Sequence, residues 1–384
     1  MTTWLPIVGL LLIVAAILLA SHRQSWQRVF HWLPVPLWCY ALPAIAVACG
    51  ALPAGHPAYR LLTDQLLPLA LGLLLLGVNL SAVIQVGGSA LAAAAIGAVG
   101  IVVGAPLSVR LLTSHLPPEA WKGAGALAGT WTGGTMNLLA LRSVLGTPET
   151  IFAPLIIVDA VIAYSWMALL VAASGFQRPI NRWLRTDAMS GAPATAAITQ
   201  GSSSTTRGGL LLGGLIALGL SLMARSAAAY LPTSPLVSSA TAWMVLLVTT
   251  FALGLSLIPN VRRLGAHGSV LGYPCLYLVL AATGAQASLE GLRAAPAWLA
   301  VGVGVVAVHG TLLLLMGRLF RIPLGVLATA SQANIGGVVS APLVGAVYHQ
   351  SLMPVGLVLA MVGNALGTYL GWGSATFCRW LLHV

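Results

Sequence analysis

Charged residues are scarce in this sequence. Only 6% of its 384 residues are charged, whereas 59% are hydrophobic, and the mean hydropathy is +0.96. Soluble domains carry about 25% charged residues, so this composition excludes a soluble globular protein and indicates a lipid environment. The sequence also lacks His-Glu-x-x-His, Gly-x-x-x-x-Gly-Lys-Ser/Thr and Gly-x-Ser-x-Gly, the signatures of several large enzyme classes. We therefore do not expect an enzyme.

Acidic residues and cysteines are also rare. Six Asp and Glu are outnumbered by 17 Lys and Arg, which gives a formal net charge of +11. The basic residues are scattered between apolar stretches without an aromatic and basic stripe, so they indicate anionic lipid head groups and argue against a nucleic-acid partner. The four cysteines have no metal-ligand spacing, and we interpret them as small core residues. They are Cys39, Cys49, Cys275 and Cys378.

Long apolar stretches make up most of the chain. Each covers roughly 17 to 27 residues, enough for a helix to cross about 30 Å of hydrocarbon. We therefore expect an all-α polytopic membrane protein with about 10–13 transmembrane helices. The first stretch has neither a basic leader nor a cleavage site, which indicates a retained span and not a signal peptide. The expected spans are 4–20, 36–52, 64–84, 88–112, 119–145, 150–174, 209–229, 237–258, 268–286, 296–318, 324–347 and 352–380.

One polar interruption separates these stretches into two halves, 1–174 and 209–384. It covers 175–208, contains four arginines and includes the run Gly-Ser-Ser-Ser-Thr-Thr at 201–206. Such a composition is typical of a flexible linker. The arginines place it on the cytoplasmic side under the positive-inside rule.

The two halves carry similar features in the same order. Residues 129–137 read Gly-Thr-Trp-Thr-Gly-Gly-Thr-Met-Asn, and residues 331–340 read Ser-Gln-Ala-Asn-Ile-Gly-Gly-Val-Val-Ser. About 25 residues after each segment, one polar side chain lies within an apolar stretch. It is Asp159 in the first half and Asn364 in the second. This order predicts an internal structural repeat.

Adjacent glycines with polar neighbours mark where a membrane helix can break. Non-helical backbone at that depth survives only where it lines a cavity or is buried in protein. Broken helices at corresponding positions of two halves indicate a transporter's binding site, because helix N-termini attract anions and freed carbonyls bind cations. The alternative is close helix packing through small residues. The candidate binding residues are Thr130, Thr132, Gly133, Gly134, Thr135, Asn137, Gln332, Asn334, Gly336, Gly337, Ser340 and Asn364.

Two titratable side chains fall deep inside expected spans. Asp159 is a functional candidate because burying a carboxylate in the membrane costs about 3 kcal/mol. It could bind Na⁺ together with neutral oxygens, carry a proton, or serve as a structural residue paired with Arg142. A lone His309 among apolar residues favours a hydrogen-bonded core residue over a proton relay. The other acidic residues, at span ends or in loops, are Asp64, Glu119, Glu149, Asp187 and Glu290.

Four segments carry a family resemblance. They are Gly-Thr-Trp-Thr-Gly-Gly-Thr-Met-Asn at 129–137, Val-Asp-Ala at 158–160, Asn-Ile-Gly-Gly at 334–337 and Gly-Asn-Ala-Leu-Gly-Thr-Tyr-Leu-Gly at 363–371. Together they resemble the YjcL-like family of bacterial membrane proteins of unknown function. More distantly, the chain is similar to the superfamily of bile-acid:sodium symporters and sodium/proton antiporters. It departs from that pattern at Ala160, which removes a cation ligand, and at Val338, where proline is common.

The resemblance implies inverted repeats, a core domain with both broken helices and a supporting panel domain. The panel would comprise 1–60 and 209–262, and the core 61–174 and 263–384. With twelve spans the two broken spans would be six spans apart, and an even separation gives parallel repeats, not inverted ones. We therefore expect that one span is miscounted or that the linker contains a further helix. The resemblance also implies a multi-pass protein of the bacterial inner membrane, elevator-like movement of the core and a homodimer formed through the panel.

These patterns predict a secondary active transporter that couples Na⁺ or H⁺ to symport of a small anionic or zwitterionic organic solute. The cation would bind at Asp159 with oxygens of the broken segments. Asp159 is the one side chain predicted to bind a metal ion, which would be Na⁺. No organic cofactor is expected. One alternative is a sodium/proton antiporter, which the missing charged neighbour of Asp159 disfavours. Another is a membrane scaffold or receptor that retains a transporter fold.

Overall fold

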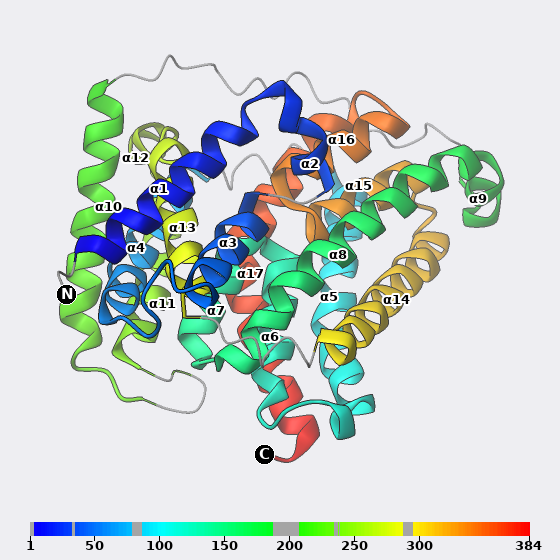
Figure 1. Ribbon diagram of the computed structural model, residues 1–384. Coiled ribbons are helices and arrows are strands. Elements are labelled where there is room, and N and C mark those ends of the chain that lie inside the picture. The colour runs from blue at the N-terminus through cyan, green and yellow to red at the C-terminus, as the bar shows by residue number, and fades with distance from the viewer. Residues whose placement is uncertain are drawn as a thin grey trace. The chain divides into compact units, whose positions relative to one another are not determined.

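The structure is a computed structural model that describes residues 4–32, 35–78, 87–186, 207–233, 237, 239–286 and 295–384. Helices form most of this part of the chain (Figure 1). The first half contains α1 (Trp4–Ser21), α2 (Gln27–Trp32), α3 (Val35–Ala48), α4 (Pro57–Leu75), α5 (Gly88–Leu111), α6 (Ala120–Gly133), α7 (Thr135–Leu145), α8 (Glu149–Ala173) and α9 (Gln177–Leu184). The second half contains α10 (Arg207–Ala228), α11 (Ala240–Ser256), α12 (Pro259–Gly265), α13 (Ser269–Gly284), α14 (Ala295–Phe320), α15 (Leu324–Ile335), α16 (Gly337–Tyr348) and α17 (Leu352–Leu382).

Seven helices within the described residues are long and apolar enough to cross a membrane. They are α1, α4, α5, α10, α14, α17 and the stretch formed by α8 together with α9. The pair α11 and α12, bent by 118°, is an eighth candidate. Each expected span overlaps a helix, but α3 and α13 have 14 and 16 residues, fewer than the roughly 20 that a crossing needs. The protein is thus helical with several membrane-spanning helices.

The expected linker is partly helical. The helix α9 has eight residues, or about 12 Å of length, so it is too short to supply the additional span. The remainder of the linker, 187–206, lies outside the described residues and includes Asp187. The segment 287–294, with Glu290, lies outside them too.

The contacts within the chain define two compact units, and each unit draws on both halves of the sequence. Unit 1 comprises Met1–Gly77, Arg142–Ala160 and Arg207–Ala295. Unit 2 comprises Val78–Leu141, Val161–Thr206 and Pro296–Val384. The boundary after Ala160 falls inside α8, so this helix belongs to both units.

Unit 1 is organised around α4 and α13. The helix α4 packs against α10, α11 and α13, and α13 also packs against α3. Glycine permits the close approach of α13 to α3, since a Cβ at Gly284 would collide with the backbone carbonyl of Tyr40.

A nearly buried ion pair lies in unit 1, where the sequence predicted only a span end. Arg142 Nη2 lies 2.7 Å from Glu149 Oε2, and the two side chains are 18% and 17% exposed. Tyr40 Oη donates to the other carboxylate oxygen of Glu149 at 2.5 Å. The guanidinium also lies 4.6 Å from the centroid of the Phe152 ring. The partner found for Arg142 is therefore Glu149, whereas the sequence made it the nearest candidate partner of Asp159.

In unit 2, a row of glycines brings α6 and α17 together. Glycines recur at every fourth residue in both helices, which places them on one face of each helix. They are Gly129 and Gly133 in α6 and Gly363, Gly367 and Gly371 in α17. A Cβ at Gly367 would lie 2.7 Å from Gly133 Cα, and one at Gly371 would lie 2.8 Å from Gly129 Cα. The two backbones are therefore in direct contact, as small residues permit in membrane helix pairs.

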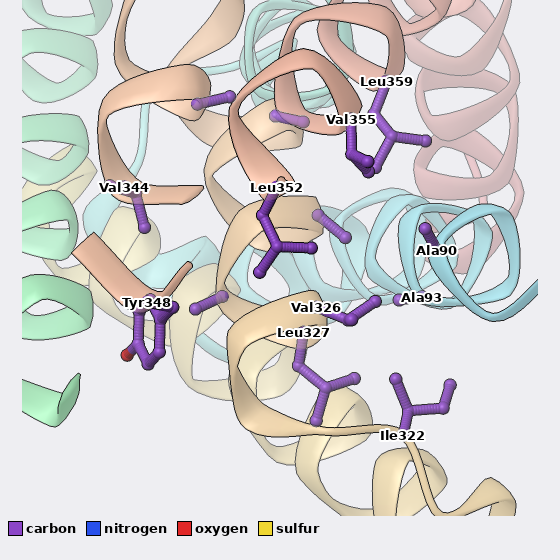
Figure 2. Close-up of a cluster of buried hydrophobic side chains, with 14 of the residues drawn as sticks. Ala90, Ala93, Ile322, Val326, Leu327, Val344, Tyr348, Leu352, Val355 and Leu359 are labelled. Atoms are coloured by element: carbon purple, nitrogen blue, oxygen red, sulfur yellow. The ribbon is translucent and has the colours of Figure 1, made fainter. Parts of the chain in front are cut away.

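The apolar core of unit 2 surrounds α15 and the start of α17 (Figure 2). Side chains of α5, α15, α16 and α17 meet there with little or no exposure. The core holds α15 along its length, so the polar residues at its C-terminal end have fixed positions. The labelled members are Ala90, Ala93, Ile322, Val326, Leu327, Val344, Tyr348, Leu352, Val355 and Leu359.

Removal of Glu149 would leave a nearly buried guanidinium without its carboxylate. We expect Glu149→Ala to lower the free energy of unfolding by about 3–5 kcal/mol, because the desolvated charge of Arg142 loses its partner. Tyr40→Phe removes one hydrogen bond to the same carboxylate and should cost only about 1 kcal/mol. Unfolding of the detergent-purified protein measures both, and equal losses would contradict the ion-pair account.

A side chain at the glycine contact would force α6 and α17 apart. We expect Gly367→Ala to lower the unfolding temperature strongly or prevent folding, because its Cβ has no room beside Gly133 and Asn137. Gly373→Ala on the same helix is the matched control, since nothing lies within 4 Å of its added Cβ. Thermal unfolding in detergent is the measurement, and similar curves for both variants would refute the backbone contact.

Candidate functional site

Two helices of unit 2 are interrupted at adjacent glycines. The chain passes from α6 to α7 at Gly134, whose φ is 77°. It passes from α15 to α16 at Gly336 and Gly337, and Gly337 has a φ of 74°. Glycine adopts this left-handed conformation without the steric penalty of a Cβ. The interruptions therefore fall within the two segments from which the candidate residues were predicted.

Asn137 connects the first interruption to α17. Its amide Nδ2 donates to the carbonyl oxygens of Gly133 at 2.5 Å and Asn364 at 3.2 Å. Its Oδ1 accepts a hydrogen bond from Thr368 Oγ1 at 2.5 Å. The side chain thus satisfies a carbonyl at the end of α6 and links the interruption to the neighbouring helix. Asn137 is a structural connection, and Thr368, its partner, was missing from the sequence-based set.

Near the first interruption, the threonines make hydrogen bonds within α6, and Gly133 packs against α17. Thr132 Oγ1 donates to Ala128 O at 2.8 Å, and the Thr130 carbonyl accepts from Gly134 N at 2.5 Å. Gly133 faces α17, so the packing alternative accounts for this glycine. Thr135 begins α7 and is half-buried. Gly134 is the member of the pair whose conformation marks the interruption.

Gln332 lies folded over the second interruption. Its Nε2 donates to Ser340 Oγ at 2.9 Å, and a Cβ at Gly336 would collide with both side chains. Its Oε1 is buried and has no hydrogen-bond partner among the described residues. Nearby, Asn334 Nδ2 donates to Ala94 O of α5 at 3.1 Å. A buried amide oxygen without a donor favours a bound cation, ammonium group or hydroxyl at this position.

The two interruptions approach each other beside α17. The helix α6 packs against both α15 and α16. A Cβ at Gly363 would collide with Thr132 O of α6 and would lie 3.9 Å from Ala333 O of α15. The side-chain oxygen of Asn364, the next residue, would lie 3.4 Å from a Cβ at Gly134. The C-terminal ends of α6 and α15 therefore bring backbone carbonyls to one place.

Neutral oxygens dominate this region of unit 2. Among its described residues, the one carboxylate side chain is Glu119, which lies 2.6 Å from Lys122 Nζ at the start of α6. No group of three or more His, Cys, Asp or Glu side chains that could hold a metal ion occurs in the described part of the chain. Carbonyl groups at two helix C-termini carry partial negative charge. The arrangement can therefore attract a cation without a carboxylate of its own unit.

A buried hydrogen-bonded chain supports α15 just before its interruption. His309 has no exposed surface, and its Nδ1 and Nε2 lie 2.8 Å from Gly97 O and from Ser331 Oγ. Trp166 Nε1 donates to the same hydroxyl at 2.8 Å. Because a carbonyl only accepts, neutral His309 carries its proton on Nδ1 and accepts from Ser331 at Nε2. His309 is thus a hydrogen-bonded core residue, while Ser331 and Trp166 are supporting residues that no sequence signal connected to it.

Asp159 lies near the middle of α8 and is half-buried. It belongs to the part of α8 in unit 1, whereas both interruptions begin in unit 2. Its role as a cation ligand stays a prediction.

Loss of Asn137 would leave buried groups of both α6 and α17 without partners. We expect Asn137→Ala to lower the free energy of unfolding by about 2–4 kcal/mol, because a carbonyl and a hydroxyl lose their hydrogen bonds together. Thr376→Ala is the control on α17, since this exposed hydroxyl bonds only within its own helix. Unfolding measurements on both variants test this, and a neutral effect of Asn137→Ala would remove its structural role.

Comparison with known proteins agrees with the predicted family. The family model described as "Protein of unknown function (DUF819)" matches residues 9–381. The chain is also 25% identical over 342 residues to the uncharacterized membrane protein YjcL of Bacillus subtilis (strain 168), covering 85% of this chain and 86% of that relative. The name of this relative and the seven apolar helices identify a multi-pass membrane protein. The chain therefore belongs to the DUF819 family of proteins of unknown function.

Proposed function

We propose that this protein is a secondary active transporter that couples Na⁺ or H⁺ to the movement of a small anionic or zwitterionic organic solute. The observation that carries the proposal is the pair of interrupted helices in unit 2, which bring backbone carbonyls of α6 and α15 to one place beside Gly363. Among membrane-spanning helices, such backbone is tolerated where it is buried in protein or lines a cavity. Paired interruptions in two halves of a chain are typical of transporter binding sites.

The helix ends at the interruptions supply both kinds of charge that such a solute needs. The ends of α6 and α15 present carbonyl oxygens, which favour a cation or an ammonium group. The starts of α7 and α16, at Thr135 and Gly337, present N–H groups, which favour a carboxylate. The unpartnered Oε1 of Gln332 adds one acceptor at the second interruption. A zwitterion matches this pairing better than a neutral solute.

Two alternative functions follow from the same features. A sodium/proton antiporter would use Asp159 as the exchanging carboxylate and would need no organic solute. A scaffold or receptor would leave the buried acceptor of Gln332 without a use. We favour symport because Ala160 follows Asp159 where a second polar ligand would strengthen an exchange site.

The proposed mechanism moves a core domain against a panel domain. Unit 2 contains α5, α14 and α17 together with both interruptions, and its segments come from both halves of the chain. In both halves a long helix is followed by an interrupted pair and then by another long helix, which supports an internal repeat. These elements are α5, then α6 with α7, then α8 in the first half, and α14, then α15 with α16, then α17 in the second. We assign unit 2 as the core and unit 1 as the panel, so 61–77, 142–160 and 263–295, which the family resemblance placed in the core, belong to the panel in this proposal. The resemblance of the sequence motifs to bile-acid:sodium symporters would imply inverted repeats, an elevator-like movement and a homodimer through the panel.

Substitution of Asp159 tests the coupling ion. We expect Na⁺ to raise the unfolding temperature of the wild-type protein, because a ligand that binds only the folded state stabilises it. Asp159→Asn should abolish this shift, whereas Asp64→Asn, at an exposed ion pair with Arg60 in α4, should retain it. Thermal unfolding in Na⁺, Li⁺ and K⁺ at several pH values is the measurement.

The outcomes separate the candidate functions. A pH-dependent shift that is lost in Asp159→Asn would indicate proton coupling, and a sodium shift retained in that variant would move the site away from Asp159. In vesicles, a symporter takes up solute under a sodium or pH gradient, whereas an antiporter dissipates a pH gradient on addition of Na⁺ alone. If the protein showed neither activity and no cation changed its unfolding temperature, the transporter proposal would be wrong.

A further inference from the structure

Five arginines gather at one end of unit 2. The helix α9 carries Arg178 and Arg182, whose spacing of four residues places them on one face, and Arg185 directly follows the helix; all three are exposed. Arg318 and Arg321 lie at the end of α14 and just beyond it. Figure 1 shows α9 beside the C-terminal end of α14. We call these five residues the arginine surface.

A direct contact joins the two parts of the arginine surface. The Arg318 guanidinium donates to the backbone carbonyl of Trp183 and lies 4.7 Å from the centroid of its ring. On another face of α9, Asn181 and Leu184 are buried, with 2% and 0% exposure. The helix is thus fixed to unit 2 by one face while its arginines point away from the protein.

No carboxylate of unit 2 is placed to neutralise this surface within the described residues. Glu119 is the one acidic side chain there, and it is paired with Lys122. Guanidinium groups form two parallel hydrogen bonds with phosphate oxygens. The charge and chemistry of the arginine surface therefore fit a phosphate-bearing anion.

The surroundings of the arginines favour a lipid over a soluble anion. Two helices of membrane-spanning length, α8 and α14, end at this surface. Exposed apolar side chains stand beside the arginines, namely Phe176, Trp183, Leu319 and Phe320. Aromatic and basic side chains at the ends of membrane helices lie at the level of the lipid head groups. A phospholipid can contact both the charges and these apolar side chains, whereas a soluble phosphate contacts only the charges.

We propose that the arginine surface binds the head group of an anionic phospholipid and that the bound lipid stabilises α15. Asn181 of α9 provides the link, since its Oδ1 accepts a hydrogen bond from Leu324 N at 2.9 Å. Pro323, the residue that precedes α15, makes no side-chain cap of its own. The side chain of α9 therefore caps the helix whose other end is the second interruption. This inference does not depend on the transporter proposal.

Lipid titration of the full-length protein in detergent tests the binding. We expect phosphatidylglycerol, but not phosphatidylcholine with the same acyl chains, to bind and to raise the unfolding temperature. The variant R178Q/R182Q/R185Q should bind phosphatidylglycerol on the order of 100-fold more weakly. R23Q/R60Q/R263Q, which removes the same charge from exposed arginines of unit 1, should bind like the wild type. Native mass spectrometry counts the bound lipids.

Three results would overturn the proposal. The first is undiminished lipid binding by R178Q/R182Q/R185Q, and the second is an equal loss in the control variant, which would show a non-specific charge effect. The third is full competition by soluble glycerophosphoglycerol, which would identify a site for a soluble anion. Unfolding curves without lipid check that each variant is folded, and Lys in place of the three arginines should restore binding in part.

Hydrogen exchange tests the link to α15. We expect phosphatidylglycerol to slow amide exchange in 324–335 of the wild type at least several-fold, and not in R178Q/R182Q/R185Q. Asn181→Ala should keep lipid binding but lose this protection, because the arginines remain while the cap is gone. Protection of α15 in Asn181→Ala equal to that of the wild type would refute the link.

Discussion

The architecture of unit 2 depends on the direct backbone contact between α6 and α17 at their glycines. Helices in lipid gain little from burying apolar surface against each other, so close backbone packing has to hold them together. Glycines at every fourth residue of both helices provide that packing. The same closeness brings Asn137 within hydrogen-bond reach of Asn364 O and Thr368 on α17. The same packing thus positions the side chain that donates to the carbonyl of Gly133 at the end of α6.

The polar residues of the two interruptions have different tasks. Asn137 and Thr132 use their hydrogen-bonding groups within the protein, and Asn334 is attached to α5. Gln332 differs, because its Oε1 is buried without a donor among the described residues. The first interruption is therefore mostly closed by internal hydrogen bonds, whereas the second keeps one buried acceptor without a donor among the described residues. A site that was predicted as two equivalent segments is chemically asymmetric.

Local sequence signals predicted the helices and their interruptions well. Every expected span overlaps a helix, although only seven helices within the described residues are long and apolar enough to cross a membrane, or eight with the bent pair α11 and α12. The glycine pairs located both interruptions, because glycine adopts the left-handed conformation found there without a steric penalty. The sequence could not show that Arg142 pairs with Glu149 or that Ser331 joins His309 to Trp166. Those contacts join residues whose proximity only the folded chain creates. The division into units was also beyond local signals, because each unit combines distant segments.

The way in which the chain passes between the two units has a mechanical consequence. The unit boundaries after Leu141 and after Ala160 fall inside continuous helices, α7 and α8. A helix resists stretching, since elongation breaks its hydrogen bonds, but it can rotate about its axis without losing any of them. These two connections behave as stiff rods and not as slack tethers. Asp159 lies one residue before such a boundary, so rotation of α8 as a whole about its axis would turn this carboxylate without changing the length of the helix.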